Sequence, residues 1–105
     1  MGKENLLDMG YKVGKKLSNK KDWIKEQASI LTCGTINVGK AKEFMFQVAT
    51  EAEEPIPLLL TKTESQLKRQ WTDILCYITG VYNGCIKASK NTGKEFQNKE
   101  EEIES

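Results

Sequence analysis

The sequence contains no histidine and only one arginine, Arg69, among its 105 residues. Without histidine, the common Ser-His and Cys-His nucleophilic centres are excluded. The three cysteines, Cys33, Cys76 and Cys85, are odd in number and form no Cys-x-x-Cys pair, so they suit neither a disulfide framework nor a structural zinc site. We therefore expect a non-enzymatic protein that binds no metal and no cofactor, with the reduced thiols of a cytoplasmic protein.

Long apolar runs are also missing. The longest mostly apolar stretch, Ile74 to Ile86, is too short and too polar to cross a bilayer, so we expect no membrane association. The chain is 38% hydrophobic and 30% charged, which is typical of a globular protein, and its length allows one domain. We predict a single helical domain over residues 1–90 and a charged, frayed or disordered acidic tail over residues 91–105.

Hydrophobic spacing of three and four residues predicts an all-α fold, a small bundle of three or four helices. The expected helices are Lys3 to Leu17, Asn19 to Cys33, a third from the Asn37 cap to near Pro55, and Thr61 to about Ser89. Gly10 and Gly14 weaken the first of these. Between the last two helices, the segment from Pro55 to Leu60 is predicted to be an extended connector packed across the helices, because prolines disfavour helix.

The longest predicted helix is the last one. Thr61 and Glu64 match a capping box at its start. Its apolar seam consists of Leu67, Trp71, Ile74, Ile78, Val81, Cys85 and Ala88. Such a seam must be covered, either by the other helices or by a second copy in a homodimer, and we expect the homodimer. The Gly80–Gly84 pair has two interpretations, a close approach of another helix or an early kink or end of this one.

One phosphate-binding motif is present in part. Residues Gly34 to Lys40 match the Gly-x-x-x-x-Gly-Lys core of a P-loop. However, Ala41 stands where a serine or threonine should bind magnesium, and the rest of the chain shows no repeated strand–helix units. We interpret the match as a coincidence within a turn between helices.

Charge is arranged in blocks along the chain. Residues 1–42 carry a surplus of five positive charges, residues 43–60 contain four glutamates and no basic residue, residues 61–94 carry a surplus of four positive charges, and residues 95–105 have a net charge of −4. The first block suggests a surface that contacts nucleic-acid phosphates, or simply a solvated helical face. The candidate binding residues are Lys12, Lys15, Lys16, Lys20, Lys21 and Lys25, with Lys68 and Arg69 as possible additions.

Two functions fit these patterns. The first is a nucleic-acid-binding accessory protein, of phage, plasmid or bacterial type, that contacts phosphate backbones through its lysines; the shortage of arginine argues against extensive base readout. The second is a protein–protein interaction module, such as an inhibitor, immunity protein or assembly factor, that acts through a helical face.

Overall fold

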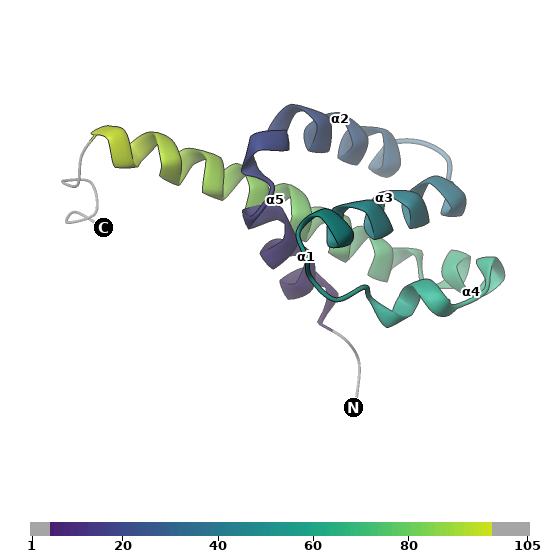
Figure 1. Cartoon of the computed structure of the whole chain (residues 1–105). Coiled ribbons are helices and arrows are strands. Elements are labelled where there is room, and N and C mark those ends of the chain that lie inside the picture. The colour runs from purple at the N-terminus through teal and green to yellow at the C-terminus, as the bar shows by residue number, and fades with distance from the viewer. Residues whose placement is uncertain (1–4, 98–105) are drawn as a thin grey trace.

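The computed structural model describes the backbone of residues 5–97 and the side chains of residues 5–90. The helices of this part of the chain are joined by turns and short loops and it contains no strand, which confirms the all-α prediction. The α-helices are α1 (Leu6–Lys15), α2 (Lys21–Thr32), α3 (Val38–Glu51), α4 (Glu64–Arg69) and α5 (Trp71–Gln97), with short 3-10 helices η1 (Ser18–Lys20) and η2 (Leu58–Thr61). Figure 1 shows α5 running the length of the molecule, with the other helices gathered around its first half.

The contact between α1 and α5 is the closest in the fold. A Cβ atom added to Gly14 would collide with the carbonyl oxygen of Val81 and lie 2.8 Å from the backbone nitrogen of Cys85. A Cβ atom on Gly84 would collide with the carbonyl oxygen of Tyr11 and lie 3.1 Å from the backbone nitrogen of Lys15. Gly10 and Gly80 are enclosed in the same way. Two Gly-x-x-x-Gly pairs, one on each helix, therefore let the two backbones touch, and of the two interpretations of Gly80–Gly84 the close approach is correct.

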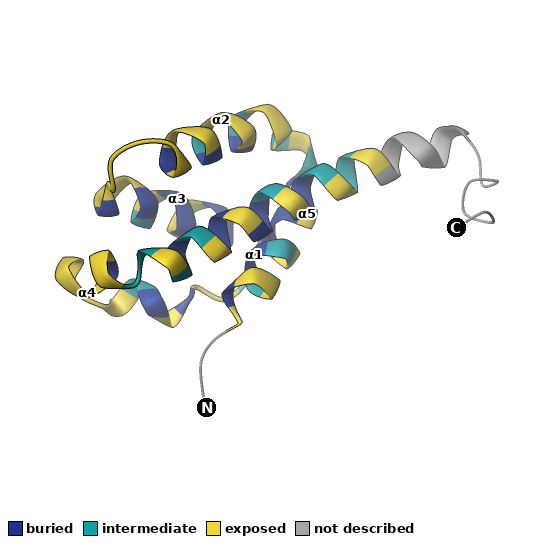
Figure 2. Ribbon diagram, turned by 180° about the vertical axis from the view of Figure 1, so that it is seen from behind, coloured by how far each residue is buried: buried dark blue, intermediate teal, exposed yellow. Residues whose placement is uncertain are grey.

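The apolar seam of α5 is buried within the single chain. Ile74, Ile78 and Val81 have no exposed surface and Cys85 is 1% exposed, and they share one core with residues from α1, α2 and α3. Figure 2 shows the buried side of α5 facing these helices. Trp71 at the start of the seam is only partly buried. Covering this seam therefore does not require a second copy of the chain.

The start of the last helix differs from the prediction. The capping box is formed by Thr63 and Gln66, not by Thr61 and Glu64. The reason is that Leu58–Thr61 forms a 3-10 turn instead of an extended segment, and the Thr61 hydroxyl donates to the Leu58 carbonyl at 2.7 Å. The predicted single helix is also interrupted at Gln70, which separates α4 from α5.

The remaining predictions agree with the structure more closely. Asn37 caps α3, its side chain accepting a hydrogen bond from the Lys40 amide at 3.0 Å. Helix α3 ends at Glu51, before Pro55, and Glu53 adopts a positive φ of 57° in the following turn. Helix α5 continues beyond residue 90 to Gln97, and the rest of the predicted acidic tail lies outside the described residues. Within the described part of the chain, no helix is long and apolar enough to span a membrane.

Candidate nucleic-acid interface

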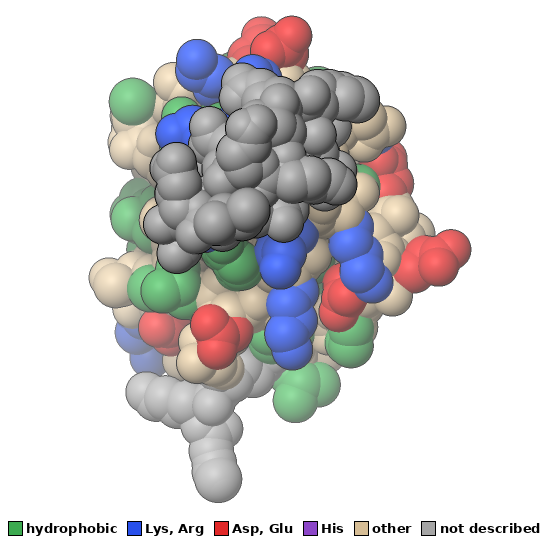
Figure 3. All heavy atoms as spheres, turned by 90° about the vertical axis from the view of Figure 1, so that its left-hand side faces the viewer, with side chains coloured by type: hydrophobic (Ala, Val, Ile, Leu, Met, Phe, Trp, Pro, Cys, Tyr) green, Lys and Arg blue, Asp and Glu red, His purple; other side chains and the backbone are tan. Residues whose placement is uncertain are grey.

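Six of the predicted lysines lie on one continuous stretch of the fold. Lys12 and Lys15 are on α1, Lys16 follows it directly, Lys20 is in η1, and Lys21 and Lys25 are on α2. All are exposed except Lys20, which is half-buried. We call these six residues the lysine surface. Figure 3, which looks along α5 toward the body of the protein, shows lysine and arginine side chains both below the grey residues and at the upper left of this face, with acidic side chains among them.

Two members of the lysine surface already have partners. Lys16 forms an ion pair with Glu54 at 2.7 Å, and Lys20 forms one with Glu51 at 3.0 Å. The bond from Lys20 and a hydrogen bond from Gln47 lower the pKa of Glu51. Burial raises it, but by less. These pairs join the end of α1 and η1 to the end of α3. Lys16 and Lys20 thus bridge neighbouring elements, and they would have to exchange partners to contact a phosphate.

Aromatic rings position two of the lysines. The Lys15 ammonium lies 5.6 Å from the centre of the Tyr11 ring, and the Lys20 ammonium lies 5.5 Å from the centre of the Trp23 ring. Both distances are within the range of a cation–π interaction, which leaves the far side of the ammonium open to other partners. Trp23 is itself held against Phe44, with ring centres 5.6 Å apart. Lys15 and Lys20 are therefore partly ordered by aromatic rings that are close to them in sequence.

Two lysines of α5, which the sequence analysis did not select, lie near the same end of the molecule. The backbone contact of Gly84 with α1 and the hydrogen bond from the Cys85 thiol to the Leu17 carbonyl, at 3.4 Å, bring this part of α5 against the end of α1. Lys87 and Lys90 follow directly and are exposed. They lie on α5 within six residues of Gly84, beyond the point where α5 crosses α1, and the paired glycines were the available signal for that crossing.

Lys68 and Arg69 lie elsewhere. They belong to the short helix α4, which lies at the opposite end of the molecule from the projecting part of α5 in both ribbon views (Figures 1 and 2). The structure therefore divides the eight predicted binding residues into a group of six and a separate pair. A ligand that contacts both would have to extend along the protein.

The P-loop-like segment has none of the geometry of a phosphate loop. The residues before Gly34 are the last turn of α2 instead of a strand, and α3 starts at Val38 with Asn37 as its cap. Nothing lies within 4 Å of the position where Gly34 would carry a Cβ atom, and no glycine of the described residues has a positive φ. These glycines serve no tight turn, in agreement with the interpretation of the match as a coincidence.

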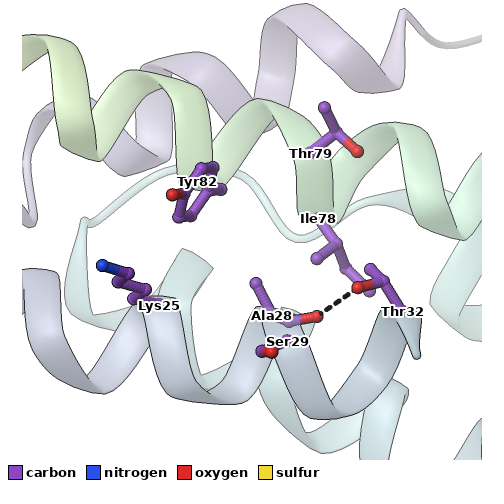
Figure 4. Close-up of a pocket in the computed structure, with 7 residues that line it drawn as sticks. All are labelled: Lys25, Ala28, Ser29, Thr32, Ile78, Thr79 and Tyr82. Atoms are coloured by element: carbon purple, nitrogen blue, oxygen red, sulfur yellow. Dashed lines mark hydrogen bonds between the residues drawn. The ribbon is translucent and has the colours of Figure 1, made fainter. Parts of the chain in front are cut away.

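A groove lies between α2 and α5, with a volume of about 280 Å³. Ala28 and Ile78 are the buried residues of its lining. Its other lining residues are Lys25, Ser29, Thr32, Thr79 and Tyr82. Figure 4 shows these side chains coming from the two facing helices, with the Thr32 hydroxyl bonded to the Ala28 carbonyl at 2.8 Å. The groove thus combines apolar surface with hydroxyl groups and one cation, and through Lys25 it adjoins the lysine surface.

Two buried groups have altered acidity. Burial raises the pKa of the Tyr77 hydroxyl, and the nearby charge of Glu54 adds to the effect. This hydroxyl has no hydrogen-bond partner among the described residues. Burial also raises the pKa of the Cys85 thiol, against a smaller lowering by Lys21. Both groups lie inside the core, so they suit packing and not surface chemistry.

Comparison of the chain with protein-family models, with curated proteins and with solved structures finds no match.

Proposed function

We propose that this protein binds the phosphate backbone of nucleic acid through the lysine surface, without catalysis. The observation that supports the proposal is that Lys12, Lys15, Lys21 and Lys25 are exposed on α1 and α2, two helices that are consecutive in the chain and separated only by η1. Each lysine that meets a phosphate releases condensed counterions, so affinity depends on salt and little on base sequence.

The local charge balance supports this proposal. The six residues of the lysine surface, with Lys87 and Lys90, make eight ammonium groups. The carboxylates on the same helices are Asp8 on α1, Asp22 and Glu26 on α2, and Asp73 near the start of α5, and the Glu51 and Glu54 carboxylates at the end of α3 pair with Lys20 and Lys16. Among the described side chains, eight ammonium groups therefore face six carboxylates, a surplus of two positive charges. A localised surplus of this kind steers polyanions toward one face of a protein whose net charge is low.

The experiment is a salt series measured by fluorescence anisotropy with a labelled duplex of about 20 base pairs. The test variant is K12Q/K15Q/K21Q, which removes three exposed charges without touching either ion pair. The slope of log K against log salt should become shallower by about 2.7, because each lost phosphate contact is worth about 0.9.

The matched control is K40Q/K42Q/K68Q, which removes three charges from α3 and α4. It should leave the slope unchanged. Equal effects of the two triple variants would show that only total charge matters, and the proposal of a defined surface would fail. A wild-type protein that binds no duplex at low salt would overturn the proposal as well.

The groove between α2 and α5 favours one alternative function, a protein–protein interaction module. Its floor of Ala28 and Ile78 could take an apolar side chain, while Lys25 at its edge could pair with an acidic neighbour. Under this alternative, the partner would be a protein segment that is apolar and acidic. Substitution of Thr79 by Trp would fill the groove and abolish that binding, and because it adds no charge it would leave duplex binding unaffected.

A further inference from the structure

The single arginine of the chain lies at a small polar hollow. Lys62, Gln66, Arg69 and Gln70 line this hollow, which has a volume of about 170 Å³. Gln66 and Arg69 belong to α4, Lys62 precedes the helix and Gln70 follows it, and spacings of three and four residues place them on one side. The lining contains two cations and two amides and no carboxylate.

Hydrogen bonding within α4 fixes one of the amides. The Gln66 side-chain oxygen accepts the Thr63 backbone N–H at 3.0 Å as part of the capping box. Its amide nitrogen, which can only donate, is the group left for another partner. The Gln70 side-chain oxygen is buried without a partner among the described residues. The residues that line the hollow are therefore two cations and two amides, and each amide can donate only through its nitrogen.

The two cations of the hollow are not neutralised. Within the described part of the chain, neither Lys62 nor Arg69 lies within ion-pair distance of a carboxylate, whereas Lys16 and Lys20 do. A guanidinium has a planar fork of donors that matches two oxygens of a phosphate, and an ammonium adds a point charge. Two positive charges also match the charge of about −1.5 to −2 that a phosphate monoester carries near pH 7.

We propose that this hollow binds the terminal phosphate of a phosphomonoester. A volume of about 170 Å³ is below the roughly 300 Å³ or more of a typical drug-sized pocket, so it admits a phosphate group and leaves the rest of the ligand outside. The site is distinct from the lysine surface, which we propose for the singly charged diesters of a nucleic-acid backbone. The hollow thus adds a second binding site and does not depend on the first.

The test is an NMR titration of the ¹⁵N-labelled protein with inorganic phosphate, glycerol phosphate and dimethyl phosphate in turn. The side-chain amide signals of Gln66 and Gln70 should shift with the first two ligands, and dimethyl phosphate should bind at least tenfold more weakly. R69Q should weaken binding of glycerol phosphate at least tenfold, and R69K should recover part of that loss.

The controls separate this site from general charge effects and from the proposed duplex binding. Lys68 is exposed, lies next to Arg69 and does not line the hollow, so K68Q should leave the affinity within twofold of wild type. K12Q/K15Q/K21Q should also leave it unchanged, even if that variant loses duplex binding. Three results would overturn the proposal. K68Q could weaken the binding of glycerol phosphate as much as R69Q does, dimethyl phosphate could bind as tightly as glycerol phosphate, or neither the Gln66 nor the Gln70 amide signal could shift. Circular dichroism of each variant confirms that the helices are retained.

Discussion

The contact of α1 with α5 makes a sharp prediction for Gly84. In Gly84→Ala the new methyl group would collide with the Tyr11 carbonyl oxygen and lie 3.0 Å from the Tyr11 carbonyl carbon. These are backbone atoms, which cannot rotate away, so the two helices must separate. Overpacking of this kind costs typically about 1–3 kcal/mol and occasionally more, while alanine gains up to about 1 kcal/mol of helix propensity. Because the whole crossing has to move, we take the upper end and expect a net loss of about 2 kcal/mol.

Gly39→Ala is the matched control for this substitution. Gly39 lies in the first turn of α3, and the only atom near the position of the new methyl group is the Asn37 side-chain oxygen of the helix cap, at 3.6 Å. The same chemical change should here stabilise the protein by up to about 1 kcal/mol. The two substitutions therefore have opposite expected signs.

Thermal unfolding followed by circular dichroism at 222 nm measures both effects. For a domain of this size, 1 kcal/mol corresponds to a shift in Tm of about 4–8 °C, so Gly84→Ala should melt roughly 8–16 °C below wild type, and Gly39→Ala slightly above it. Urea unfolding should give the same order. If Gly84→Ala proves as stable as wild type, the backbone contact between α1 and α5 is wrong.

Three further predictions concern titratable groups. Glu51→Gln should lower the free energy of unfolding by less than about 1 kcal/mol at pH 7. Because Lys20 lowers the pKa of Glu51, the charged carboxylate stabilises the folded protein at pH values above the ordinary pKa of 4.5. This stabilisation is lost as the pH falls through the lowered pKa. The gap between wild type and variant in urea midpoints should thus close in acid, and a gap that persists there would refute the pairing. Tyr77→Phe removes a buried hydroxyl without a described partner and should leave stability at pH 7 unchanged or raise it by up to about 1 kcal/mol. The pKa of Tyr77 is raised in the folded protein, so above pH 10.0 this hydroxyl ionises in the unfolded chain but not in the folded one. Relative to the variant, the wild type should therefore lose about 1.4 kcal/mol of stability per pH unit above that pH. Identical stability profiles of the two proteins at alkaline pH would contradict this. A thiol reagent should modify the exposed Cys33 and Cys76 rapidly and the buried Cys85 only on unfolding, so rapid release of a third equivalent from the native protein would show that the core around Cys85 is open.

The helical fold was predictable because it rests on local patterns. Spacing of apolar residues and the Asn37 cap act within a few residues, and both are found in the structure. The capping box was assigned two residues too early because two overlapping segments match its pattern. What decides between them is the use of the Thr61 hydroxyl in the 3-10 turn, and that depends on how the Pro57 segment packs.

The candidate site was less predictable because it depends on contacts distant in sequence. No local rule pairs Lys16 with Glu54, so the sequence could not show that two of the six lysines already have carboxylate partners. The glycines of α1 are costly for an isolated helix, yet the structure uses them with those of α5 to bring two backbones into contact. That contact also brings the part of α5 just before Lys87 against the end of α1.

The most direct test of the proposed binding surface is the salt dependence of duplex binding by K87Q/K90Q. These two lysines are far from the others in sequence and follow the part of α5 that crosses the end of α1, and we propose that they extend the lysine surface. We predict a slope shallower by up to about 1.8, because each lost contact is worth about 0.9, with the helices intact by circular dichroism. If K87Q/K90Q has the same slope as wild type while K12Q/K15Q/K21Q has a shallower one, α5 is not part of the binding surface formed by α1 and α2, and the account is contradicted.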